Sequence, residues 1–132
     1  MSASDNKEML RGIYVEVAKG NPQPFLDAMS DDVRWTLIGS TKFSGSYSGK
    51  QNVLEKFLAP VLAEVDGHME LTPHNFIADG DYVAMQATGK SLTKYGKRYD
   101  NTYCHVFRIV DGKIREITEY CDTELITQAF SA

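Results

Sequence analysis

The sequence predicts an α+β fold in which helices pack on one face of a curved antiparallel sheet. Helical spacing of apolar residues dominates the first half of the chain, whereas nearly all of the second half reads as strands. Short turns separate consecutive strands, which is typical of an antiparallel meander. In such a fold, an apolar pocket between the helices and the sheet is the expected place for a ligand.

The N-terminal segment combines helices with one strand. Ser4 or Asp5 can cap a first helix that runs to about residue 19, and a short second helix follows Pro24. Residues 33–38 then alternate as a strand, which places Trp35 and Leu37 on one face.

A loop and a long helix complete the first half. Residues 39–49 are rich in glycine and serine and are expected to form a loop. The helix covers about residues 50–65, and its apolar stripe includes Phe57 and Val61. Pro60 falls inside the stripe, so the helix should kink or break near residue 59.

Four strand patterns and a short tail make up the second half. The tail is expected to form a last helix with Asp122 as its N-cap. The whole chain, residues 1–132, is interpreted as a single domain without linkers or repeats. The four predicted strands cover residues 68–78, 82–93, 98–110 and 113–121.

Composition narrows the class of protein. The 132 residues are 42% hydrophobic and 24% charged, with a net charge of −4, which fits a soluble globular protein and disfavours nucleic acid as a partner. Neither a signal peptide nor an apolar stretch long enough for a membrane span is recognisable. Only Cys104 and Cys121 are cysteines, so we expect a reducing compartment and a cytoplasmic protein.

The register of the last hairpin decides which side chains face the pocket. A two-residue Asp111-Gly112 loop would pair Cys104 with Glu119. A three-residue Val110–Gly112 loop, with Gly112 in a bulge, pairs Tyr103 with Glu119 instead. We favour the second register because it gathers aromatic and apolar bulk on one face, which carries Asn101, Tyr103, His105, Phe107, Ile117, Glu119 and Cys121.

The opposite face of the hairpin predicts an interface. It carries Cys104, Val106, Thr118 and Tyr120, and this set is too apolar for a face in bulk water. We therefore expect a homodimer that forms through the outer face of the sheet.

Two residues of the inner face are candidates for proton chemistry. Burial would disfavour the charged form of Glu119, so its carboxyl could act as a general acid or base near neutral pH. It could equally be a buried polar group satisfied by Tyr103, Arg115 or His105. His105 could be a proton shuttle, an oxyanion donor or a packed core residue.

No metal or cofactor site is expected. His68, Glu70 and His74 share one face of a predicted strand, but no cysteine or second carboxylate accompanies them. The sequence also has no glycine-rich phosphate loop and no Ser–His–Asp order typical of acyl transfer.

The order of elements and two short motifs resemble a known superfamily. Residues 107–114 read F-R-x-x-D-G-K-I, and residues 119–122 read E-Y-x-D. Over essentially its whole length the chain resembles the nuclear transport factor 2-like superfamily, and within it the SnoaL-like and ketosteroid-isomerase-related proteins. The resemblance implies a cone-shaped α+β barrel with an internal apolar pocket, and a homodimer. Members of the superfamily include isomerases, cyclases, epoxide hydrolases, dehydratases and proteins of no known activity.

The resemblance to ketosteroid isomerases extends to three positions. Tyr14 lines up with the tyrosine that hydrogen-bonds the substrate oxygen, and His105 with the protonated aspartate that is the second oxyanion donor. Leu37 occupies the position of the aspartate base. An aliphatic side chain cannot carry a proton, so steroid isomerisation by that mechanism is not expected.

Two other groups in the superfamily point to Glu119. It matches one catalytic carboxylate of limonene-epoxide hydrolases. Trp35 stands where those enzymes carry a water-binding tyrosine, and Gln86 and Thr88 stand where they carry an arginine and a second aspartate. In SnoaL-like cyclases a single pocket acid does the proton work, and Glu119 is the acid nearest to that role.

These observations predict a small-molecule pocket protein, and we favour a cofactor-free acid–base enzyme acting on an apolar, oxygenated ligand. Glu119 would be the acid or base, and His105 and Tyr14 would stabilise a developing oxyanion. The alternatives are a non-catalytic binding protein for a small hydrophobic ligand, and a dimeric scaffold whose pocket is filled by its own side chains. The expected ligand-binding residues are Trp35, Leu37, Phe57, Val61, Gln86, Asn101, Tyr103 and Ile117.

Overall fold

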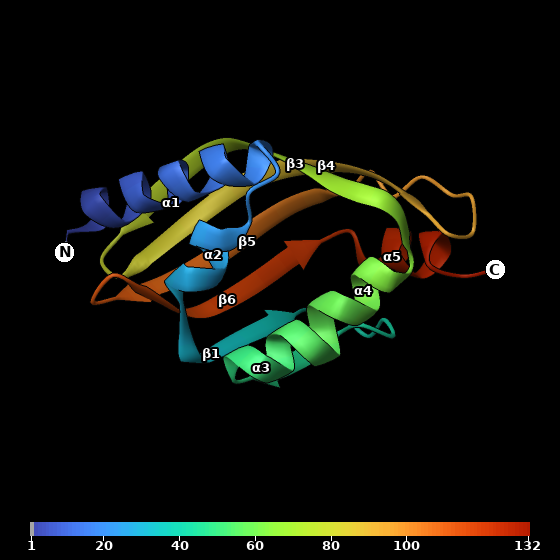
Figure 1. The fold of residues 1–132 in the computed structure, drawn as a ribbon, viewed down its shortest axis with the longest axis horizontal. Helices are drawn as coiled ribbons and strands as arrows, with labels where there is room; N and C mark the ends of the chain where they lie inside the picture. Colours follow the sequence, from blue (N-terminus) through green and yellow to red (C-terminus); the bar gives the residue numbers. More distant parts are fainter. Residues whose placement is uncertain (1) are drawn as a thin grey trace.

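The structure, a computed structural model, describes residues 2–132. All helices except the last lie on one side of a single curved sheet, and the two ends of the chain lie at opposite ends of the molecule (Figure 1). The elements in chain order are α1 (Ala3–Ala18), α2 (Gln23–Ala28), β1 (Met29–Leu37), β2 (Gly45–Ser48), α3 (Lys50–Asn52), the π-helical segment η1 (Val53–Leu58), α4 (Ala59–Ala63), β3 (Val65–Asp79), β4 (Tyr82–Thr93), β5 (Thr102–Val110), β6 (Lys113–Cys121) and α5 (Thr123–Ala129).

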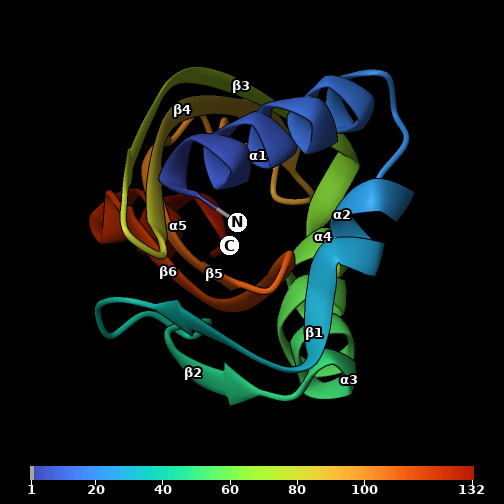
Figure 2. The same cartoon turned by 90° about the vertical axis from the view of Figure 1, so that its left-hand side faces the viewer.

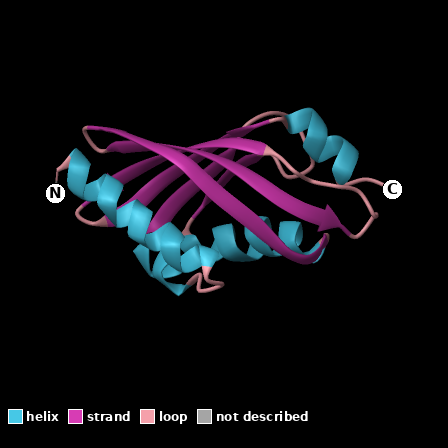
Figure 3. Cartoon of the chain, turned by 90° about the horizontal axis from the view of Figure 1, so that it is seen from above, coloured by secondary structure: helices cyan, strands magenta, loops and turns pink. Residues whose placement is uncertain are grey.

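The six strands have the order β2-β1-β6-β5-β4-β3. The sheet curls around α1, and α3 and α4 face its open side (Figure 2). Figure 3 shows α1 running along one face of the strands while α5 covers one end. The predicted α+β class, with helices on one face of a curved sheet, is confirmed.

Two features of the sheet refine the prediction. Neighbouring strands are antiparallel, as expected, except that β1 and β6 are parallel. The edge strands β2 and β3 do not pair, so the predicted barrel remains an open cone. The parallel pair arises because β6, the last strand of the β3–β6 meander, comes to lie beside β1 and runs in the same direction.

The first helix begins earlier than the sequence suggested. Ser2, not Ser4 or Asp5, is the N-cap. Its hydroxyl oxygen accepts a hydrogen bond from the Asp5 N–H, and the Asp5 carboxylate accepts one from the Ser2 N–H, which together form a capping box. The buried stripe of α1 includes Leu10, Ile13 and Tyr14, as the helical spacing predicted.

The middle of the chain differs from the prediction in two places. The loop expected over residues 39–49 contains β2, which pairs with β1 from Leu37↔Gly45 to Arg34↔Ser48. The long helix does not break at Pro60 but widens into the π-helical turn before it, where the Ala59 N–H donates to the Leu54 carbonyl. A wider turn fits a proline, which lacks an N–H and crowds the preceding turn. The helix ends at Ala63 because Val65 already belongs to β3.

The strands of the second half follow the prediction closely. β4 and β6 have the predicted bounds, β3 is longer at its N-terminal end, and β5 begins at Thr102 rather than at residue 98. Asp122 caps α5 by accepting a hydrogen bond from the Leu125 N–H, as predicted. No helix within residues 2–132 has both the length and the apolar character needed to cross a membrane.

Both predicted registers of the last hairpin are wrong, although the predicted inner face is right. The turn is a two-residue Asp111-Gly112 loop in which both residues have positive φ. A bulge then shifts the pairing from Ile109↔Ile114 to Arg108↔Glu116, so that Arg115 is the extra residue. His105 therefore lies opposite Glu119. This register differs by two residues from the one we favoured, and a shift of two leaves each side chain on its face.

Candidate functional site

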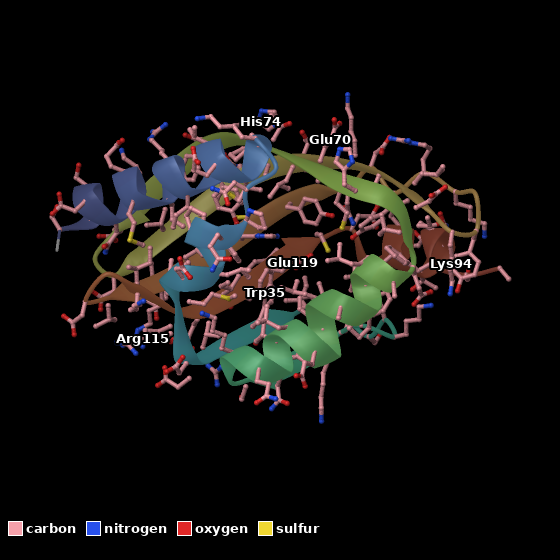
Figure 4. All side chains as sticks on the ribbon, viewed as in Figure 1. Trp35, Glu70, His74, Lys94, Arg115 and Glu119 are labelled. Atoms are coloured by element: carbon pink, nitrogen blue, oxygen red, sulfur yellow. The ribbon has the colours of Figure 1, made fainter. Side chains whose placement is uncertain are left out.

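A cavity of about 170 Å3 lies between the sheet and the helices, toward the end that α5 covers. The inner faces of β1, β5 and β6 form its floor, η1 and α4 form one wall and β3 another. Figure 4 shows Trp35 and Glu119 in the interior, whereas Glu70, His74, Lys94 and Arg115 lie at the periphery. The cavity is lined by Trp35, Leu37, Phe43, Phe57, Leu58, Val61, Met69, Glu70, Leu71, Tyr99, Tyr103, His105, Glu119, Ile126 and Phe130.

Strand alternation and the parallel β1–β6 pair build the floor. On β5 and β6 every second side chain points inward, which places His105 next to Glu119 across the antiparallel ladder. On the other side of β6, Leu37 of β1 pairs with Glu119 and Trp35 pairs with Ile117. The carboxyl of Glu119 is thus flanked by side chains from both neighbouring strands.

Glu119 has a polarised and largely desolvated carboxyl. Its Oε1 accepts a hydrogen bond of 3.2 Å from the Trp35 indole Nε1, and the residue is 8% exposed. Burial raises the pKa of Glu119 to about 7, and the Trp35 hydrogen bond opposes part of that rise. At neutral pH the carboxyl is therefore divided between its acid and carboxylate forms, which suits proton transfer in either direction.

His105 is a buried imidazole without a hydrogen-bond partner among the described residues. Neither Nδ1 nor Nε2 makes a hydrogen bond, and Nε2 lies 3.8 Å from Glu119 Oε1. Its ring packs edge-on against those of Trp35 and Tyr103. Burial lowers the pKa of His105 to about 4, so the imidazole is neutral at physiological pH. A buried polar group left unpaired is costly, and one that borders a cavity is suited to a ligand.

Two tyrosines, one just before β5 and one near its start, form a further wall of the cavity. Tyr99 and Tyr103 both line the cavity, and Asn101 lies between them in sequence. The Asn101 side-chain nitrogen donates to the Tyr99 hydroxyl at 3.1 Å. Tyr103 fits closely against Gly89 of β4, where a Cβ atom would come within 2.8 Å of the tyrosine ring.

Aromatic side chains from the β1–β2 loop, from η1 and from the C-terminal tail cover the cavity, and polar contacts outside the cavity hold the loop in place. Phe43 reaches in from the loop between β1 and β2 and packs edge-on against Phe130. Lys42 holds this loop, because its Nζ lies 2.7 Å from both Glu64 Oε1 and the Phe130 carbonyl. Phe57 of η1 packs 5.3 Å from Trp35 between ring centres.

Seven of the residues singled out in the sequence line the cavity together: Trp35, Leu37, Phe57, Val61, Tyr103, His105 and Glu119. The others lie elsewhere. Gln86 is exposed on the outer face of β4 and bonds Asn75, so its predicted place in the pocket is wrong. Asn101 holds Tyr99 and Asp122 from behind the wall.

Tyr14 and Ile117 are buried but lie outside the cavity lining. Tyr14 packs edge-on against Phe25 and Phe107, toward the filled end of the cone. Burial and the nearby Glu119 charge raise its pKa, which keeps the phenol protonated. Because the α1 stripe points toward that end, the predicted contact between Tyr14 and a ligand oxygen finds no support in the geometry.

Several cavity residues were missed. Tyr99 shares the parity of Asn101 and Tyr103, so strand alternation could have placed it on the inner face. Phe43 and Phe130 also line the cavity. The position of Phe43 in a loop beside a strand end and the i, i+4 spacing of Ile126 and Phe130 favour inward positions, but neither pattern separates the cavity from the packed core. Among residues 2–132 no cluster of three or more His, Cys, Asp or Glu side chains could hold a metal ion.

Comparison with known proteins places the chain in a family. A sequence profile of the SnoaL-like domain matches residues 10–117, and the chain belongs to this family. Comparison with curated protein sequences gave no match.

Solved structures show the same fold over the full chain. A nuclear transport factor 2-like protein of unknown function from Burkholderia pseudomallei is 24% identical, with 100% of both chains covered and a TM-score of 0.85. TerC, co-crystallised with polyporic acid, is 25% identical, with 96% of this chain and 98% of TerC covered and a TM-score of 0.80. A candidate SnoaL-like polyketide cyclase from Jannaschia sp. CCS1 is 18% identical, with 98% of this chain and 94% of that chain covered and a TM-score of 0.77.

Proposed function

We propose that the protein is a cofactor-free acid–base enzyme that moves a proton on an apolar, oxygenated ring compound. The observation that carries the proposal is the Glu119 carboxyl, whose pKa is raised to about 7 inside an aromatic cavity beside the unpartnered imidazole of His105. A carboxyl in that environment can take a proton from a C–H group next to a carbonyl and return it elsewhere. Neutral His105 borders the same space and can donate an N–H to the ligand beside the carboxyl.

The size of the cavity favours a small ring as the part of the ligand that is enclosed. A cavity of about 150 Å3 lined by apolar side chains holds benzene, and this cavity measures about 170 Å3. The co-crystallisation of TerC with polyporic acid supports a small organic ligand here. A scaffold whose pocket is filled by its own side chains fits this open volume poorly.

Hydrogen–deuterium exchange on a model ketone tests the proposal without knowledge of the substrate. Acetophenone is a single ring with an enolisable methyl ketone, and exchange of its methyl protons in D2O can be followed by proton NMR. We expect the protein to catalyse this exchange and Glu119→Gln to slow it about 100-fold or more. Glu116→Gln is the matched control, because Glu116 lies on the same strand but pairs with Arg34 outside the cavity. Exchange that is unchanged in Glu119→Gln would contradict the assignment.

A non-catalytic binding protein is the second candidate. It is favoured by Leu37, an aliphatic side chain paired with Glu119 at the position where ketosteroid isomerases carry their base. A ligand that co-purifies and stays chemically unchanged during long incubation, with no exchange of acetophenone protons, would support this alternative.

We also propose that two copies associate through the outer face of the sheet. Tyr120 is 46% exposed there, and Cys104, Val106 and Thr118 are half-buried around it. Tyr82 adds a further exposed ring on the same face. A dimer mass by light scattering at micromolar concentration is expected, and a monomer mass would overturn the proposal. The acidic net charge and the free thiols Cys104 and Cys121 support a cytoplasmic protein that does not bind nucleic acid.

A further inference from the structure

Tyr99 and Tyr103 carry two hydroxyl protons that are not donated to any other residue within 2–132. The hydrogen bond made by this pair comes from outside it: the Asn101 side-chain nitrogen donates to the Tyr99 oxygen at 3.1 Å. The two phenols lie close enough to each other to affect each other's pKa.

The direction of the Asn101 contact is fixed by its other partners. Its Oδ1 accepts from the backbone N–H of Thr102 at 2.8 Å and from that of Asp122 at 3.1 Å. Its Nδ2 donates to the Asp122 carbonyl at 3.0 Å. Reversing the amide would place its NH2 group against two N–H donors, so Nδ2 can only donate to Tyr99. The Tyr99 oxygen must accept this bond, and its own proton points elsewhere.

Both tyrosines border the cavity that contains Glu119. Tyr99 is 4% exposed and Tyr103 is 7% exposed, and each lines the same space as the carboxyl. Burial, with a contribution from the Glu119 charge, raises the pKa of both phenols, so they remain proton donors throughout the physiological range. An O–H group that is buried without an acceptor is costly, and a ligand oxygen would satisfy it.

We propose that the Tyr99–Tyr103 hydroxyl pair, aligned by Asn101, is a donor site for a carbonyl oxygen of the ligand. The substrate class is therefore a ring-bearing ketone, whose oxygen is held at the tyrosines while its carbon skeleton lies among the aromatic side chains near Glu119. Asn101 is a positioning residue, since it touches Tyr99 and the start of α5 rather than the ligand. The inference rests on the proposed function only in that the cavity binds such a ligand.

Two ligands of nearly the same shape, of which only one can accept a strong hydrogen bond, test the donor site. Acetophenone carries a carbonyl where α-methylstyrene, which has nearly the same shape, carries a methylene group that cannot accept a strong hydrogen bond. Affinities are measured at pH 8, where Glu119 is mainly a carboxylate and does not compete as a donor. We expect the wild-type protein to bind acetophenone about tenfold more tightly than α-methylstyrene, and Tyr99→Phe/Tyr103→Phe to lose that preference. Binding of α-methylstyrene should change little, because both rings remain.

The single variants and a control sharpen the result. Tyr103→Phe should keep most of the preference, since Asn101 still aligns Tyr99, whereas Tyr99→Phe should lose more of it. Tyr82→Phe removes a hydroxyl from the exposed outer face and should have no effect. A preference that survives in the double variant and disappears in His105→Leu would overturn the inference. So would a wild-type protein without any preference, and that measurement does not depend on the folding of a variant. Neither outcome requires turnover, so failure here is distinct from failure of the acid–base proposal.

Discussion

The two ends of the cone are built by the same strands but are packed in opposite ways. At the end near the β5–β6 turn, Phe107, Ile109 and Ile114 are at most 1% exposed and share the buried core with Leu10 and Met29. No cavity-lining residue comes from this end. At the other end the inward positions of the same strands are Tyr103, His105 and Glu119, and they surround about 170 Å3 of open space.

The change from filled core to cavity occurs between two successive inward-facing residue pairs of β5 and β6. Phe107 pairs with Ile117, and the next inward pair along the ladder is His105 with Glu119. Buried polar groups are expensive unless they are partnered, so a fold that places two of them beside a void is organised for something other than stability.

The largest predicted effect is on the filled end. Phe107→Ala should lower the free energy of unfolding by about 3–5 kcal/mol, because it opens a new cavity in a part of the core that has none. Denaturant unfolding followed by fluorescence or circular dichroism measures this loss.

Phe43→Ala is the matched change at the hollow end. Phe43 is 7% exposed and already borders open space, so part of its contact surface has no partner to lose. We expect a cost of about 2 kcal/mol or less. Equal losses in the two variants would show that the two ends do not differ in packing.

The second prediction concerns pH, because the two buried titratable residues oppose each other. The pKa of Glu119 is raised from 4.5 to about 7, so its contribution to stability is full below pH 4.5 and is lost as the pH rises through 7. The pKa of His105 is lowered from 6.5 to about 4, so its contribution is full above pH 6.5 and is lost as the pH falls through 4. Each contribution is about 3 kcal/mol at its fullest, and between pH 4.5 and 6.5 their opposite changes with pH nearly cancel.

In a variant that lacks one of the two residues, the free energy of unfolding should change with pH as the remaining residue dictates. Relative to the double variant, Glu119→Gln should gain stability as the pH rises from 4 to 6.5, and His105→Leu should lose stability as the pH rises from 4.5 to 7. Denaturant titrations at several pH values provide the measurement, and the double variant removes the background from all other groups. Parallel curves for the three variants would mean that neither residue has a displaced pKa.

The sequence predicted the fold and most of the floor of the cavity because both depend on periodicity. Alternation on β5 and β6 placed His105 and Glu119 inward, and it did so even though the predicted hairpin register was wrong. The bulge at Arg115 could not be read from the chain, since no glycine or proline marks it. The parallel pairing of β1 with β6 likewise depends on the path of the chain between distant strands.

Strand alternation predicted the positions of pocket residues more accurately than resemblance to family members did. Gln86 was selected through its match to a family position, yet it lies on the outer face of β4, where alternation with buried Met85 and Ala87 would have placed it. Tyr14 was selected in the same way and packs into the filled end. An aligned position gives a residue its place in the chain, whereas neighbouring side chains decide where that residue points.

A third prediction changes the volume of the hollow end without removing any of its polar groups. In Gly89→Ala the new Cβ atom would lie 2.8 Å from Tyr103 Cε2 and 3.4 Å from the Glu70 carbonyl. The Tyr103 ring must move, and the cavity is the open space beside it. We expect a loss of about 1–3 kcal/mol in stability from overpacking, together with weaker binding of acetophenone. Gly12→Ala on α1 has no atom within 4 Å of its Cβ and serves as the control. Unchanged acetophenone affinity in Gly89→Ala would show that Tyr103 does not border the ligand.

The smallest predicted effect separates the two influences on Glu119. The Trp35 indole is a hydrogen-bond donor to the carboxylate and lowers its pKa, whereas burial raises it. Trp35→Phe keeps an aromatic wall but removes the donor, so the pKa of Glu119 should rise above 7, by about 0.7 if the bond contributes about 1 kcal/mol. The pH midpoint of acetophenone exchange reports this value, and so does the infrared band of the carboxyl group. Tyr47→Phe, which loses a hydroxyl bonded to the Phe43 carbonyl behind Phe57, should leave the midpoint in place. A midpoint that falls in Trp35→Phe would mean that water entering the space left by the indole outweighs the lost bond, and that the hollow end is less dry than its aromatic lining indicates.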